Sequence, residues 1–96
     1  MTSVVQRRSL VDSLIAQVLN SAREHGVSVH IDFPADDDDG NIYVKFGDYV
    51  YCLCATEHGV GCHKSFKGQP FKRCYLKTLL NDAPSDVAEA RRAVAA

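Results

Sequence analysis

The sequence has no apolar run approaching the ~18 residues that a membrane-spanning helix requires. Its N-terminal segment also lacks the continuous apolar core and small-residue cleavage site of a secretion signal. From these absences we expect a cytoplasmic protein without a membrane partner. Thiols stay reduced in that compartment, so the four cysteines indicate free thiols, a metal site or redox sensing rather than structural disulfides.

Motifs of common enzyme sites are also missing. A phosphate-binding loop would need glycines at the positions of His58 and His63. The four consecutive aspartates at 36–39 lack the alternating spacing of an EF-hand loop, and strand-like segments flank them. A cysteine–histidine nucleophile pair needs an orienting group and a cleft, for which 96 residues leave little room. We therefore predict that the chain is not an enzyme.

The net charge of −1 favours no class of partner, but the charges are unevenly distributed along the chain. Residues 32–57 contain seven acidic residues and one basic residue, whereas residues 58–77 contain five basic residues and no acidic one. We call residues 58–77 the basic stretch. Two charge runs of this kind fit either solvated loops or a surface that attracts a partner of opposite sign.

Hydrophobic periodicity predicts a helix followed by a strand. Apolar residues recur at spacings of three and four between Val11 and Ala22, and Gly26 is placed to end a helix. Residues 27–33 then alternate between apolar and polar side chains, as in a half-buried strand.

The strongest local signal is a hairpin turning at Gly47 and Asp48, because alternating residues flank this two-residue link. Cys52 and Cys54 should then project from the sheet face away from the first helix. The residues expected to face that helix are Ile42, Val44, Phe46, Tyr49, Tyr51 and Leu53.

The remaining segments complete the expected fold. Residues 56–69 read as a loop, Pro70 fits the first turn of another helix, and Pro84 opens a short final helix. We predict a single small α+β domain over residues 1–96, with the final ~10 residues frayed. It would contain an N-terminal helix, a three-stranded antiparallel sheet, a long basic loop, and one or two C-terminal helices packed on one sheet face.

The cysteines allow three interpretations. One zinc ion could be bound by a subset of five candidate ligands, although their spacing departs from the usual paired ligands. The cysteines could instead pack as small apolar residues, without any cofactor. Cys62 could also be a redox-active thiol, because its glycine-rich surroundings suggest exposure. The candidate metal ligands are Cys52, Cys54, Cys62, His63 and Cys74.

The basic stretch interleaves cations with aromatic residues and is the predicted binding surface. We predict a protein-interaction module, such as a regulator or inhibitor of the phage or mobile-element type, that docks on a larger protein partner. The alternative is a zinc-supported nucleic-acid-binding module, although a pI of about 6.4 is low for that class. A homodimer covering the open sheet face is also compatible with the sequence. The predicted binding residues are Lys64, Phe66, Lys67, Phe71, Lys72, Arg73 and Lys77.

Overall fold

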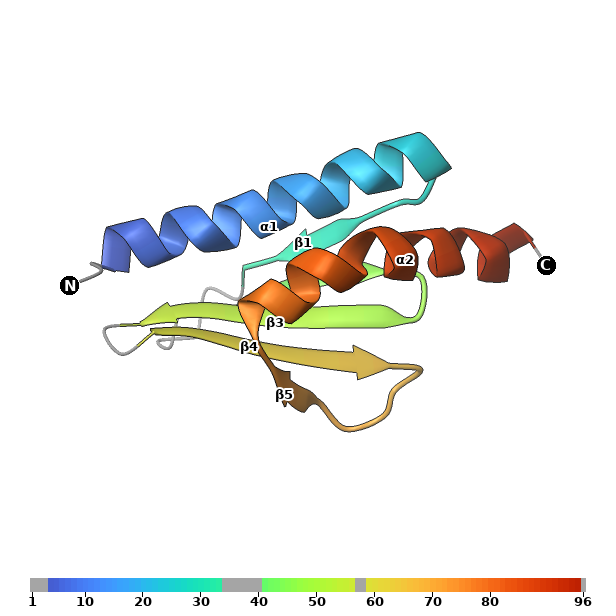
Figure 1. Cartoon of the computed structure of the whole chain (residues 1–96). Coiled ribbons are helices and arrows are strands. Elements are labelled where there is room, and N and C mark those ends of the chain that lie inside the picture. The colour runs from blue at the N-terminus through green and yellow to red at the C-terminus, as the bar shows by residue number, and fades with distance from the viewer. Residues whose placement is uncertain (1–3, 34–40, 57–58, 96) are drawn as a thin grey trace.

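The computed structural model describes residues 4–33, 41–56 and 59–95 (Figure 1). Its elements are helix α1 (Val4–His25), strands β1 (His30–Asp32), β2 (Ile42–Phe46), β3 (Tyr49–Thr56), β4 (Gly59–Phe66) and β5 (Lys72–Cys74), and helix α2 (Leu76–Ala95).

The strands form one antiparallel sheet in which neighbours in sequence are neighbours in space, from β1 to β5. Both helices pack against each other on the same face of this sheet (Figure 1). The α+β class is therefore confirmed. The prediction of three strands is wrong in detail, because the sheet has five.

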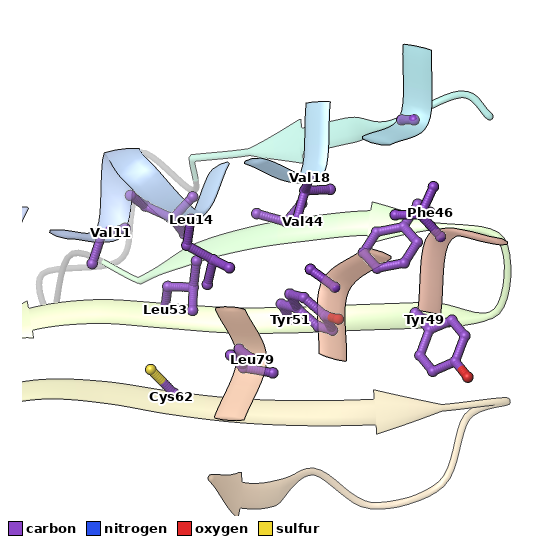
Figure 2. Close-up of a cluster of buried hydrophobic side chains, with 14 of the residues drawn as sticks. Val11, Leu14, Val18, Val44, Phe46, Tyr49, Tyr51, Leu53, Cys62 and Leu79 are labelled. Carbon is purple, nitrogen blue, oxygen red and sulfur yellow. The ribbon is translucent and has the colours of Figure 1, made fainter. Parts of the chain in front are cut away.

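The hairpin between β2 and β3 has the predicted register. Phe46 lies opposite Tyr49, and all six residues expected to face the first helix are buried. Figure 2 labels five of them: Val44, Phe46, Tyr49, Tyr51 and Leu53. Gly47 has a positive φ of 55°, as the first central residue of a tight hairpin turn can require. A Cβ at Gly47 would lie 2.7 Å from the Cβ of Ala90, so the turn also packs closely against α2.

The expected loop at residues 56–69 is largely strand β4, which pairs along its whole length with β3. Two features conceal the strand in the sequence. Gly59 and Gly61 have no side chains to extend the alternation, and a charged residue, Lys64, occupies the face that packs under the helices.

The helix expected from Pro70 begins later, at Leu76, because residues 72–74 form β5 instead. Before β5 the chain reverses through a tight turn in which Lys67 and Gly68 have φ values of 54° and 72°. The Gln69 amide donates to the Phe66 carbonyl across this turn at 3.1 Å. The turn sets β5 antiparallel to β4.

The expected break at Pro84 does not occur, since Pro84 lies inside the continuous helix α2. Proline has no N–H to donate to the carbonyl four residues earlier, that of Leu80. Gln17 on α1 supplies the missing donor, with its Nε2 2.6 Å from the Leu80 oxygen. Pro84 thus removes one backbone hydrogen bond from α2 and leaves the Leu80 carbonyl available for a polar contact with α1.

The first strand is also shorter than the alternation of residues 27–33 predicts. Only His30–Asp32 pair with β2, and Phe33, expected on the buried side, keeps 59% of its surface exposed. Asp32 forms an ion pair with Lys45 at 3.7 Å on the open face.

Candidate interaction surface

Side-chain alternation divides the basic stretch between two faces of the sheet. Lys64 lies between Tyr51 and Lys72 in a cross-strand row, and Tyr51 is buried under the helices. His63 lies beside Arg73 in the adjacent row, so both belong to the open face. The cations of the stretch therefore have different surroundings, although they are close in sequence.

The charge of Lys64 is matched inside the chain. Its Nζ lies 2.6 Å from Oδ2 of Asp86 and 4.0 Å from Oδ2 of Asp82, both on α2. The Tyr51 hydroxyl donates to the same Asp86 oxygen at 2.5 Å. The Lys64 Nζ also lies 5.1 Å from the centre of the Tyr49 ring, within cation–π range. Lys64 therefore links β4 to α2 through ion pairs, and the carboxylates of Asp86 and Asp82 compensate its charge.

Two tyrosines that hydrogen-bond to carboxylates of α2 have raised pKa values. Burial raises the pKa of Tyr51 far above its usual range, and the hydrogen bond to Asp86 adds to the increase. Burial and a hydrogen bond to Glu89, 2.6 Å long, likewise raise the pKa of Tyr49. We did not predict these acidic residues, because Asp86 is 35 positions from Tyr51 and no local pattern connects them.

A hollow of about 210 Å³ lies beside Lys64. It brings together four predicted binding residues: Lys64, Phe66, Lys72 and Arg73. Phe66 in its lining also contacts the Tyr49 ring in a tilted arrangement, with 4.6 Å between the ring centroids. The complete lining is Lys64, Phe66, Gln69, Pro70, Lys72, Arg73, Cys74, Thr78, Leu79 and Asp82.

Cations and aromatic rings that face solvent gather around β5. Phe71 and Tyr75 keep 46% and 80% of their surfaces exposed, unusually much for large rings. Four cations near them are exposed, and none forms an ion pair with a residue in the described part of the chain. We call this group the β5 surface: Lys67, Phe71, Lys72, Arg73, Tyr75 and Lys77.

Phe71 connects this surface to the open face of the sheet. Its ring lies edge-on to that of Tyr43, with 6.5 Å between the centroids. The Ser65 hydroxyl donates to the Gln69 carbonyl at 2.6 Å, which ties β4 to the turn that precedes Phe71. Tyr43 and Phe71 therefore form an aromatic pair close to Arg73.

The four cysteines divide between the two faces, and none forms a disulfide. Cys52 and Cys54 lie on the open face with His63, as predicted for the two cysteines. Cys62 and Cys74 lie opposite each other on the helix-facing side.

The expectation that Cys62 is exposed is wrong, since only 1% of its surface is accessible (Figure 2). Burial, with the neighbouring thiols of Cys74 and Cys52, raises its pKa to about 11. Burial also raises the pKa of Cys74, against the opposing charge of Lys64. Both thiols stay protonated at neutral pH, which disfavours a reactive role.

The predicted zinc site would have to draw ligands from both faces of the sheet. Within residues 4–33, 41–56 and 59–95, no group of three or more His, Cys, Asp or Glu side chains could hold a metal ion. His58 lies outside the described residues. Bound zinc stays a prediction that the geometry does not favour.

Comparisons with protein-family models, with curated proteins and with solved structures found no match to this chain. Among the helices in the described ranges, neither has the length and apolar character needed to cross a membrane. The fold and the surface thus define a two-layer α+β protein with helices on one sheet face and a cationic, aromatic edge.

Proposed function

We propose that this chain is a small non-enzymatic interaction module that docks on an acidic region of a larger protein through the β5 surface. The observation that supports the proposal best is the concentration around one edge strand of two exposed aromatic rings and four exposed cations that form no ion pair with another described residue. Aromatic residues and arginine are enriched at protein interfaces and among the residues that dominate binding energy.

The charge pattern supports a partner of opposite sign. Lys64 is paired with carboxylates of α2, whereas the cations of the β5 surface are exposed and have no acidic ion-pair partner within the described ranges. Complementary charges would raise the association rate and exclude basic partners. The adjacent hollow, with Phe66, Pro70 and Leu79 in its lining, could bury an apolar side chain of the same partner.

The test uses a labelled oligoglutamate peptide and a random single-stranded oligonucleotide of equal charge, each titrated by fluorescence anisotropy over a range of salt concentrations. We expect the peptide to bind more tightly and the double variant Lys72→Glu/Arg73→Glu to lose about tenfold or more in affinity, about 1.4 kcal/mol. Arg23→Glu/Arg91→Glu makes the same charge change outside the β5 surface and should bind nearly as well as the parent. Equal losses in both double variants would mean that only net charge matters and would refute the proposal.

A nucleic-acid-binding function is the second candidate. The Tyr43–Phe71 pair beside Arg73 favours it, because aromatic rings and cations on an open antiparallel sheet can stack bases and neutralise phosphates. Tighter binding of the oligonucleotide than of the peptide, with a steep decrease as salt is added, would establish this alternative. Metal analysis of protein purified without chelators tests the associated zinc prediction.

A further inference from the structure

We propose that the partner's acidic region binds in extended form, as a sixth strand added to the free edge of β5. This inference rests on the proposed function and specifies its binding mode. Among the described strands β5 pairs with β4 alone, and it lies at the margin of the sheet (Figure 1). Outside helices and sheet ladders, no backbone hydrogen bond among the described residues involves Phe71 to Cys74. An edge strand offers N–H and C=O groups that an incoming strand can pair with.

The charges distinguish β5 from the other edge of the sheet. At β1 the exposed edge contains Asp32, and the aspartates 36–39 follow it in the sequence. An acidic strand would gain little there, because Asp32 already pairs with Lys45, whereas β5 presents Lys72 and Arg73 with no acidic residue in the strand. Pairing of β5 with the β5 strand of a second copy is disfavoured, because it would bring these cations together.

Side-chain alternation also specifies the sequence pattern of the partner. Strand alternation directs Arg73 to the open face and Lys72 and Cys74 to the helix-facing side, where the hollow lies, although Arg73 also contributes to the rim of the hollow. An added strand would therefore place acidic side chains on the open face, near Arg73. Its alternate side chains would face the hollow, where Phe66 and Leu79 favour apolar groups. The expected ligand is an extended segment that alternates acidic and apolar residues.

The experiment compares capped peptides of alternating glutamate and valine that differ only in backbone methylation. One peptide is unmodified, the second is N-methylated at every glutamate, and the third at every valine. In a strand, successive N–H groups point to opposite sides, so only one of the two methylated peptides has its bonding edge blocked. We expect that peptide to bind about tenfold or more weakly than the other, as expected for the loss of one or more backbone hydrogen bonds.

Amide hydrogen exchange supplies an independent measurement. The unmodified peptide should slow the exchange of at least one amide among Lys72, Arg73 and Cys74, and should leave the amides of β1 unchanged. Substitution of lysine for every glutamate should abolish binding, because the charges would then repel Arg73.

The outcomes separate this inference from the proposed function. If both methylated peptides bind as tightly as the unmodified one, the strand-addition mode is wrong and acidic docking through side chains stands. Binding of oligoglutamate but not of the alternating peptide leads to the same conclusion. If neither acidic peptide binds while the random oligonucleotide does, the proposed function itself is wrong, and this inference with it.

Discussion

At the scale of single residues, the most informative group is the charged cluster between β4 and α2. Lys64 occupies a position on β4 that faces the helices, where an apolar residue is usual. It is tolerated there because its Nζ pairs with Asp86, which also accepts a hydrogen bond from the Tyr51 hydroxyl. A partly buried ion pair of this kind is weak evidence for stability, but removal of one partner leaves the other charge unmatched.

We predict that Asp86→Leu lowers the free energy of unfolding by about 2 kcal/mol, because Lys64 and the Tyr51 hydroxyl then lose their partner. The double variant Lys64→Met/Asp86→Leu should recover most of that loss, since an apolar pair leaves no charge unmatched. Urea denaturation of the parent, both single variants and the double variant measures the coupling. Strictly additive effects of the two substitutions would show that the pair does not act as a unit.

Gly47 permits a second prediction at the residue scale. Gly47→Ala should cost about 1–3 kcal/mol, because the new methyl group must adopt a positive φ and also meet the Cβ of Ala90. Gly68→Ala is the matched control: its φ of 72° is also positive, but nothing lies within 4 Å of the added Cβ. Thermal denaturation should show a larger loss at Gly47. Equal losses at both positions would mean that the contact with α2 is unimportant.

At the scale of elements, the structure explains which parts of the fold the sequence could predict. The hairpin was predictable because alternation and turn residues agree over residues 42–53. Strand β4 was not, since Gly59 and Gly61 interrupt the alternation and the partner of Lys64 lies on a distant helix. The local spacing of apolar residues cannot predict contacts between residues that are distant in the sequence.

The boundaries around the β5 surface were misjudged for a related reason. Phe71, Cys74, Tyr75 and Thr78 are spaced as in a helix, so the pattern fits α2 as well as the strand that precedes it. The turn at Lys67 and Gly68, and the pairing of β5 with β4, depend on tertiary contacts. The predicted binding residues did gather around β5, but only the fold separates Lys64 from the exposed cations.

The contact between α1 and α2 provides the element-scale prediction. Gln17→Ala should cost about 1 kcal/mol, because it removes the donor to the Leu80 carbonyl. In a Pro84→Ala background the amide of residue 84 can bond that carbonyl, so the same Gln17 substitution should cost less. A double-mutant cycle by chemical denaturation measures the difference. An identical cost in both backgrounds would show that Gln17 does not compensate for the proline.

At the scale of the whole molecule, the covered face of the sheet and the β5 surface have distinct physical roles. The covered face buries Tyr51, Phe46 and Leu79 and uses the polar atoms of α2 to complete the hydrogen bonds of the tyrosines. The β5 surface contributes little to this core and keeps its cations in solvent. Substitutions there should therefore alter binding far more than stability, which makes the charge-reversal variants clean probes of function.

The covered face also predicts how stability depends on alkaline pH. The pKa of Cys62 is raised from about 9 to about 11 in the folded chain, and the pKa values of Tyr49 and Tyr51 are raised above their usual 10. A group with a raised pKa binds its proton more tightly when folded. Its contribution is therefore complete below the unfolded pKa and is lost as pH rises toward the folded pKa.

We therefore expect the free energy of unfolding to begin falling near pH 9 with Cys62, and more steeply above pH 10 as the tyrosines contribute. Urea denaturation at successive pH values measures the slope, while absorbance of tyrosinate shows whether Tyr49 and Tyr51 ionise only as the chain unfolds. Tyr51→Phe should reduce the slope above pH 10, and Cys62→Ala should reduce it between pH 9 and 11. A stability that stays constant between pH 9 and 11 would contradict the burial of these groups, because thiols and phenols in water would titrate alike in both states.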